Sequence, residues 1–203
     1  MEEKVPSCVI YNVIVNLNLE TKKDADLVLE SLKNKDAFGE IINRYQDKLA
    51  RYISRRANVS KQDIEDLLQN IFIKTYLNLN NFDQKLKFSS WIYRITHNEV
   101  VSWYRKKKIR PQIFLDNKNK KLENFIASEI DIEKEYIQKD LIENIKRALP
   151  EINEKYREVI MLRFFEEKDY GEISDILEIP AGTVATRISR GKKELEKIIS
   201  DFL

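Results

Sequence analysis

The side chains best suited to chemistry lie between positions 72 and 110, where aromatic and basic residues alternate. The aromatic members, which include both tryptophans, are Phe72, Tyr76, Phe82, Phe88, Trp91, Tyr93, Trp103 and Tyr104. The basic members are Lys85, Lys87, Arg94 and the run from Arg105 to Arg110. Aromatic rings stack on unpaired bases while Lys and Arg follow the phosphates. The pattern predicts single-strand binding, although Phe72, Tyr76 and Trp91 also fit an apolar core.

A second candidate site is the segment Tyr170–Lys193, whose spacing predicts a helix-turn-helix. At about 100° per residue, its second helix places Val184 and Ile188 on the inner side. The polar residues Thr186, Ser189, Arg190 and Lys193 fall on the outer side, and Arg187 flanks the core. Such a helix fits the major groove of duplex DNA. An ordinary pair of packed helices is the alternative interpretation.

A third candidate is the polar face of the helix expected around residues 64–79. Asp66, Gln69 and Asn70 lie three to four positions apart, so they share or adjoin one side of that helix. This face favours either a protein interface or a simple solvated surface.

Composition excludes several classes of function. The chain has 203 residues and a net charge of +2, with a single cysteine and a single histidine. An intramolecular disulfide, Cys-based zinc sites and His triads are therefore excluded. With only 4 glycines and 4 prolines, long helices are expected rather than Gly-rich phosphate loops. We expect no enzyme, no metal and no other cofactor. No apolar run reaches the roughly 18 residues of a membrane span, so we expect a cytoplasmic protein without membrane insertion.

The small net charge conceals a strong segregation along the chain. Residues 36–110 carry 15 basic and 8 acidic residues, a net of +7, whereas residues 139–203 carry 12 and 14, a net of −2. Charge concentrated in this way is compatible with nucleic-acid binding by one part of the chain.

The hydrophobic periodicity predicts an all-α fold with two small helical domains, at residues 24–110 and 133–203. A linker at 111–132 joins them, and residues 1–23 form an N-terminal extension. We expect Ser60 with Asp63 to cap one helix, and Ser89 or Ser90 to cap the next.

Residues 66–107 followed by the hairpin at 170–193 resemble the sigma-70 family of RNA polymerase sigma factors, in the short form of the extracytoplasmic-function (ECF) group. The resemblance implies a region 2-like domain at 24–110 and a region 4-like domain at 133–203. It implies that Asp66, Gln69 and Asn70 bind the clamp coiled coil of the polymerase β′ subunit.

The resemblance also implies two sets of DNA contacts. Residues expected at the −10 element are Lys85, Lys87, Phe88, Tyr93, Arg94, Asn98, Trp103, Tyr104, Arg105 and Lys106. Residues expected at the −35 element are Thr183, Ala185, Thr186, Arg187, Ser189, Arg190 and Lys193. The partners so implied are core RNA polymerase (β′ clamp coiled coil and β flap), promoter DNA and an anti-sigma factor. The alternative hypothesis is a stand-alone helix-turn-helix regulator that binds duplex DNA without polymerase.

Overall fold

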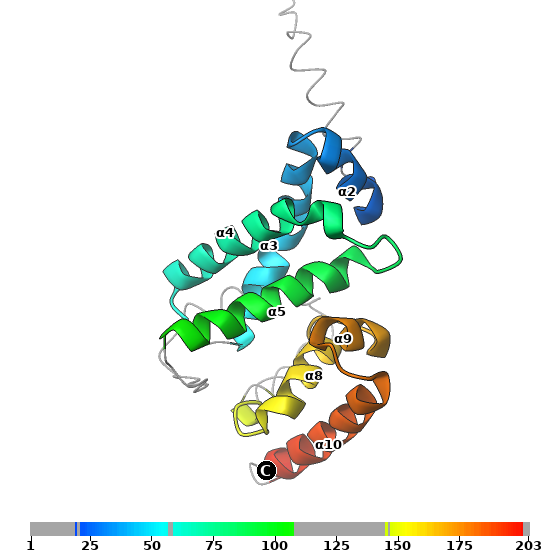
Figure 1. Ribbon diagram of the computed structural model, residues 1–203. Coiled ribbons are helices and arrows are strands. Elements are labelled where there is room, and N and C mark those ends of the chain that lie inside the picture. The colour runs from blue at the N-terminus through cyan, green and yellow to red at the C-terminus, as the bar shows by residue number, and fades with distance from the viewer. Residues whose placement is uncertain (1–18, 20, 57–58, 108–144, 146, 201–203) are drawn as a thin grey trace, which may run out of the picture.

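The structure is a computed structural model that describes residue 19, residues 21–56 and 59–107, residue 145 and residues 147–200. The expected linker at 111–132 and most of the expected N-terminal extension lie outside the described residues. The described part of the chain is helical and contains no strand, which confirms the all-α prediction (Figure 1).

Within the described residues, the N-terminal group is formed by four α-helices. They are α2 (Asp24–Lys33), α3 (Asp36–Arg56), α4 (Lys61–Leu77) and α5 (Phe88–Lys107), with the short 3-10 helix η1 (Leu79–Asn81) after α4. Helix α3 buries an apolar stripe, as Ile41, Leu49 and Ile53 are fully inaccessible to solvent. Burial of such stripes, rather than intrinsic propensity, supplies most of the stability of helices of this length.

Three further helices form the C-terminal group: α8 (Glu154–Phe164), α9 (Tyr170–Leu177) and α10 (Ala181–Ser200). The last two make the predicted helix-turn-helix, and the turn between them passes through Glu178 with φ of 53°. Val184 and Ile188 face the core as expected, and Ile173 of α9 is buried with them. On α9 the second buried residue is Ile176, while Leu177 is only partly buried.

The helix starts agree only partly with the sequence. Ser60 accepts a hydrogen bond from the Asp63 amide at 3.1 Å, so the predicted cap of α4 is confirmed. The prediction that Ser89 or Ser90 caps α5 is wrong, because that helix begins at Phe88 and its first turn already includes both serines. The hydroxyl of Ser89 instead donates to Glu172 of α9 at 3.2 Å. A reciprocal capping box of Asp169 and Glu172 begins α9.

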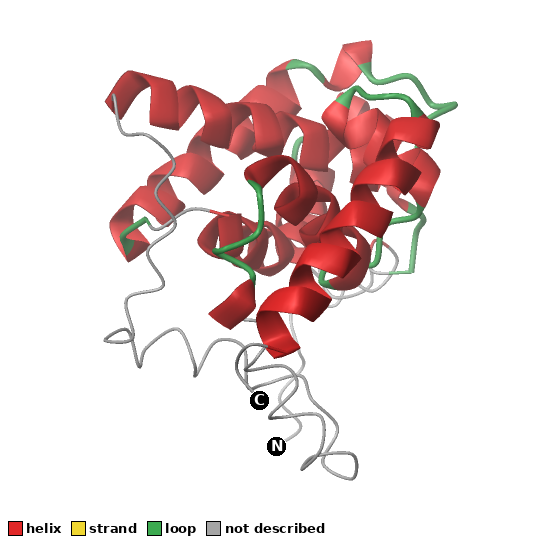
Figure 2. Ribbon diagram, turned by 90° about the horizontal axis from the view of Figure 1, so that it is seen from below, coloured by secondary structure: helices red, strands yellow, loops and turns green. Residues whose placement is uncertain are grey.

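The two groups pack against each other through α5 and α9, and α10 packs on α8 (Figure 1). Figure 2 shows from below that the described segments are helices joined by loops. Buried apolar residues of both groups form one continuous cluster. The C-terminal group is tied together by the buried Arg157, whose guanidinium donates to the carbonyls of Leu149, Pro150 and Ile152 at 2.6–2.8 Å. This packing fixes where α5, α9 and α10 present their polar side chains.

Candidate nucleic-acid interface

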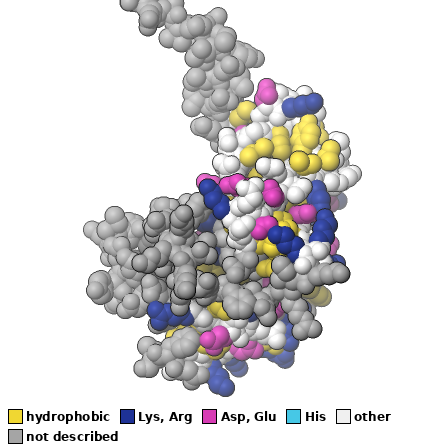
Figure 3. Space-filling view, turned by 90° about the vertical axis from the view of Figure 1, so that its left-hand side faces the viewer, with side chains coloured by type: hydrophobic (Ala, Val, Ile, Leu, Met, Phe, Trp, Pro, Cys, Tyr) yellow, Lys and Arg dark blue, Asp and Glu magenta, His cyan; other side chains and the backbone are white. Residues whose placement is uncertain are grey.

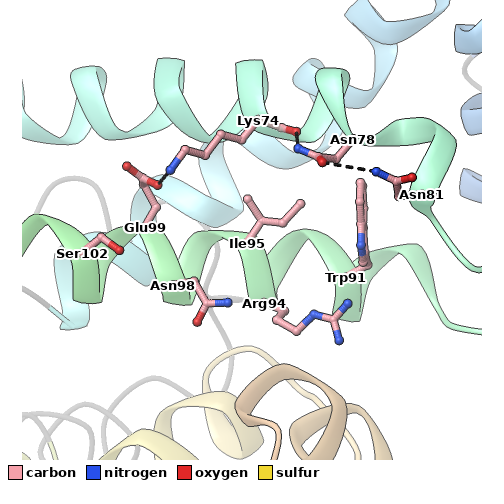
Figure 4. A pocket seen from close by; sticks show the side chains of 9 residues that line it. All are labelled: Lys74, Asn78, Asn81, Trp91, Arg94, Ile95, Asn98, Glu99 and Ser102. Atoms are coloured by element: carbon pink, nitrogen blue, oxygen red, sulfur yellow. Dashed lines mark hydrogen bonds and ion pairs between the residues drawn. The ribbon is translucent and has the colours of Figure 1, made fainter.

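A pocket of about 370 Å³ lies between α4 and α5. It is lined by Lys74, Asn78, Asn81, Trp91, Arg94, Ile95, Asn98, Glu99 and Ser102 (Figure 4). Apolar walls from Trp91 and Ile95 are combined with several amide groups, and this mixture suits a flat ring that carries hydrogen-bonding edges. The pocket therefore has the chemistry needed to hold a nucleobase.

Two polar side chains of the pocket, Lys74 and Asn98, differ in whether another residue of the pocket already binds them. Lys74 forms an ion pair with Glu99 across the pocket, and Glu99 is buried. Asn98 is exposed, and in Figure 4 its amide points away from α4, beside the guanidinium of Arg94. An Asn amide offers one donor group and one acceptor to a base edge. Asn98 is therefore an exposed amide beside the pocket, and its role in reading a base stays a prediction of the family resemblance.

Most of the aromatic rings belong to the core. Phe82, Phe88 and Trp91 contact one another with ring centroids 5.3–5.7 Å apart, and each is no more than 8% exposed. Tyr104 is also buried. In this arrangement the rings of Phe88 and Tyr104 are not available to stack on a base, because other side chains already cover them.

Trp103 is the partly exposed member of the aromatic set near the end of α5. The ammonium of Lys107 lies 4.4 Å from its ring centroid, and Tyr104 contacts its edge. Arg105 and Lys106 are exposed beside it. The last turn of α5 therefore combines an aromatic surface with several cations, as the sequence predicts for a strand-binding helix.

Just before α5 and in its first half, three of the predicted DNA contacts are instead engaged by the C-terminal group. Lys87 pairs with Asp169 at 2.9 Å, the Tyr93 hydroxyl donates to Glu166 at 2.6 Å, and Arg94 lies 3.7 Å from Glu178. Hydrogen bonding to Asp169 raises the pKa of Lys87. Burial, followed by the Glu166 charge, raises the pKa of Tyr93. Lys85, in the loop before α5, is exposed.

The outer face of α10 matches the helical-wheel prediction. Its exposed members are Thr186, Ser189, Arg190 and Lys193, whereas Thr183, Ala185 and Arg187 are only partly exposed. The inner face is so close to α8 that Gly191 is buried. Hydrogen bonding from Arg190 lowers the pKa of the Tyr156 hydroxyl, which places that guanidinium next to α8. An exposed row of hydroxyl and cationic groups on one helix can reach base edges and phosphates.

The exposed face of α4 carries more than the polar residues found from the sequence. Asp66, Gln69 and Asn70 are exposed as expected. Ile73 is 57% exposed and Leu77 is 70% exposed further along the same helix. Sequence reasoning missed both, because an apolar residue in a helix normally indicates the core; their offset from the buried Ile71 and Thr75 is the signal that identifies them.

Comparisons with known proteins agree with this geometry. Residues 41–109 match the family described as "Sigma-70 region 2", and residues 142–195 match "Sigma-70, region 4". The chain is 35% identical over 175 residues to the ECF RNA polymerase sigma factor SigW of Bacillus subtilis, which covers 83% of this chain and 92% of SigW. It is 29% identical to the ECF RNA polymerase sigma-E factor of Haemophilus influenzae, covering 84% and 91% of the two chains.

The chain therefore belongs to the sigma-70 family of RNA polymerase sigma factors, and its relatives place it in the ECF group. Such a protein is a non-catalytic subunit that directs RNA polymerase to promoters. This result decides between the two hypotheses drawn from the sequence, in favour of the polymerase subunit.

Solved structures support the fold. CnrH in complex with the cytosolic domain of CnrY has a TM-score of 0.63 at 21% identity, and the match covers 88% of this chain and 97% of CnrH. The sigma factor RpoE of Bartonella quintana, in complex with the anti-sigma factor NepR, has a TM-score of 0.58 at 21% identity, covering 80% and 96%. Within the described residues, no helix is both long and apolar enough to cross a membrane.

Proposed function

We propose that this sigma factor uses three separate surfaces in transcription initiation. The exposed face of α4 binds core polymerase, the α5 side with its pocket holds the −10 strand, and the outer face of α10 reads the −35 duplex. The observation that carries the proposal is the pocket beside Asn98, in which apolar walls and amide groups from two helices meet. The domain limits of 24–110 and 133–203 are part of this proposal.

The polymerase surface is the stripe of Asp66, Gln69, Asn70, Ile73 and Leu77 on α4. Its polar half suits hydrogen bonds and its exposed apolar half suits burial against another helix. The family resemblance points to the clamp coiled coil of β′ as that helix pair. For the C-terminal group, the resemblance points to the β flap.

Strand opening by this protein needs no nucleotide hydrolysis. Extruding a base costs a few kcal/mol, and stacking a base on an aromatic surface returns about 1–3 kcal/mol. The partly exposed Trp103 supplies an aromatic surface, and the pocket supplies apolar walls from Trp91 and Ile95 with Asn98 for the base edge. Lys85, Arg105 and Lys106 are exposed and supply positive charge for the backbone of the strand.

An anti-sigma factor is a further proposed partner. Both solved neighbours described above were determined in complex with a binding partner, named as an anti-sigma factor for RpoE. Because ECF relatives share this two-domain arrangement, we expect a protein of that class to bind this chain too.

The test is transcription by purified core polymerase on a library of promoter-like DNA, with and without this protein. We expect a subset of sequences to be transcribed only in its presence. The variant Ile73→Asp should weaken binding to core polymerase by about tenfold or more. Leu29→Asp, at an exposed apolar residue of α2, is the matched control and should not. No promoter-dependent transcription, or equal effects of the two variants, would contradict the assignment.

A further inference from the structure

The first turn of α8 packs against the part of α10 that carries Arg190 (Figure 1). The backbone amide of Asn153, which caps α8, donates to a carboxylate oxygen of Glu194 at 3.2 Å. A Cβ added at Gly191 would lie 3.2 Å from Cβ of Tyr156. One polar contact and one close packing contact therefore fix the turn of α10 from which the Arg190 side chain extends.

Tyr156, in this first turn of α8, is a core residue with a polar end. It is 7% exposed and belongs to the same buried cluster as Val184 and Ile188. Hydrogen bonding from Arg190, followed by Lys155, lowers the pKa of its hydroxyl. The ammonium of Lys155 also lies 4.7 Å from the ring centroid. Phenylalanine has the same ring, so the packing of the core by itself does not require the hydroxyl.

The cations of α10 are exposed although the C-terminal part of the chain is mildly acidic. Residues 139–203 carry a net charge of −2, yet Arg190 and Lys193 face solvent. In Figure 3, Lys and Arg side chains project at the lower end of the molecule, where Figure 1 places the C-terminal group. Because the net charge of this group does not attract DNA, recognition depends on how each cation is oriented toward its contact.

An exposed arginine reads a base poorly unless its guanidinium is held in place. A free side chain loses rotamer freedom when it binds, and that loss weakens the contact. A guanidinium has five N–H donors, and its commonest base contact uses two of them. The Tyr156 hydroxyl can therefore orient Arg190 and still leave the donors that a base edge requires.

We infer that Tyr156 is a positioning residue for −35 recognition, because its hydroxyl holds the Arg190 guanidinium in the orientation that reads a base edge. The inference rests on the proposed role of Arg190 at the −35 element. Tyr156 acts through Arg190 and does not contact DNA itself. Removing the hydroxyl therefore changes the base preference of that arginine rather than the general affinity of the protein for DNA.

The test uses Tyr156→Phe, which keeps the ring and deletes only the hydroxyl. The full-length protein is combined with core polymerase and mixed with a promoter-like duplex library that is randomised across the −35 region. Sequencing of the bound DNA gives the base preference at each position for the wild type, Tyr156→Phe, Arg190→Ala and the double variant. Thermal unfolding of each protein, followed by circular dichroism, measures its stability separately.

The two single variants should affect the same positions of the −35 region. Arg190→Ala should lower the preference for the favoured base there by about tenfold. Tyr156→Phe should lower it at those positions by about three- to tenfold, with a melting temperature close to that of the wild type. In the Arg190→Ala background, Tyr156→Phe should have no further effect, because the hydroxyl then has no guanidinium to hold.

Arg187, one turn earlier on α10, provides the matched control. Tyr156→Phe should lower the preference by the same factor in the Arg187→Ala background as in the wild type, because changes at groups that share no partner act independently. A second library, randomised across the −10 region, should give the same preferences for Tyr156→Phe and the wild type.

Three results would overturn the inference, and only the last of them reaches the proposed function. If Arg190→Ala loses base preference and Tyr156→Phe does not, the hydroxyl does not position the arginine. If Tyr156→Phe weakens every position equally, or weakens binding further in the Arg190→Ala background, it acts on the helix as a whole. If Arg190→Ala itself leaves every preference unchanged, Arg190 has no −35 role, and both the assignment of that residue and the inference fail.

Discussion

At Gly191 the final helix lies so close to α8 that a methyl group has no room. A Cβ added there would lie 2.9 Å from Cγ1 of Ile160 and 3.2 Å from Cβ of Tyr156. Ile160 is 2% exposed and branched at Cβ, so it cannot turn aside. Gly39, in the first turn of α3, is the opposite case, since nothing lies within 4 Å of its added Cβ. Replacing each glycine by alanine therefore separates packing from helix propensity.

The expected magnitudes have opposite signs. In a helix interior, alanine is favoured over glycine by about 1 kcal/mol. Gly39→Ala, in the first turn of α3, gains up to about this amount. Gly191→Ala gains it too, but forcing a methyl into a packed contact costs about 1–3 kcal/mol, which leaves a net loss of about 1 kcal/mol. The two variants should differ by about 2 kcal/mol, equivalent to roughly 4–8 °C in melting temperature for a chain of this size.

Thermal unfolding followed by circular dichroism measures this difference. Gly191→Ala should melt below the wild type and Gly39→Ala above it. Because Gly191 sets the distance of α10 from α8, the first variant should also weaken binding to −35 duplex DNA. A Gly191→Ala protein as stable as Gly39→Ala would refute the close packing of α10 against α8.

Three further predictions concern single side chains. Burial, together with the charge of Arg56, lowers the pKa of His97 from 6.5 to about 3. Glu158 lies 2.8 Å from the ring, but it does not raise this pKa because Arg56 neutralises its carboxylate. The neutral ring therefore stabilises the fold above pH 6.5, and acidification to pH 5 lowers the free energy of unfolding by up to about 2 kcal/mol. Urea titrations at pH 7 and pH 5 should show a smaller decrease in the free energy of unfolding for His97→Gln than for the wild type. Arg157→Met leaves three carbonyls without their donor and should lower the free energy of unfolding by about 3 kcal/mol, measured in urea. Arg190→Ala should weaken −35 binding by about 1–3 kcal/mol in a duplex gel shift with polymerase.

Each of these predictions has a control. Acid sensitivity equal in the wild type and His97→Gln would show that the imidazole is not held neutral. Arg163→Met, on the same helix at a partly exposed residue, should be milder than Arg157→Met. Arg187→Ala, at the edge of the core, should affect −35 recognition less than Arg190→Ala. The reverse order would mean that the two arginines of α10 exchange roles.

The helical elements and their faces follow well from the sequence. The stripe of α3 and the inner and outer sides of α10 appear in the structure as the periodicity predicts. Periodicity works here because the geometry of one helix fixes which of its residues share a side. It failed at the start of α5, where two adjacent serines suggested a cap that the structure does not use.

The fate of the aromatic residues could not be predicted in the same way. Phe88 and Tyr104 lie in a basic, aromatic-rich segment whose composition indicates nucleic-acid contact, yet both are buried. Phe88 meets Tyr45 of α3 at 5.6 Å between ring centroids. Whether a ring faces the core depends on side chains from other helices. The local spacing of residues does not show which side chains these are.

By itself, the sequence determined the all-helical class, the order of the two helical units, their unequal charge and the outer residues of α10. Only the tertiary structure decided which polar groups pair with one another inside the protein and which are exposed to contact a partner. The pairing of Glu166 with Arg55 and Tyr93 joins residues on three separate elements. The physical reason is that a charge acts through distance in space, and the sequence gives no measure of that distance until the helices have packed.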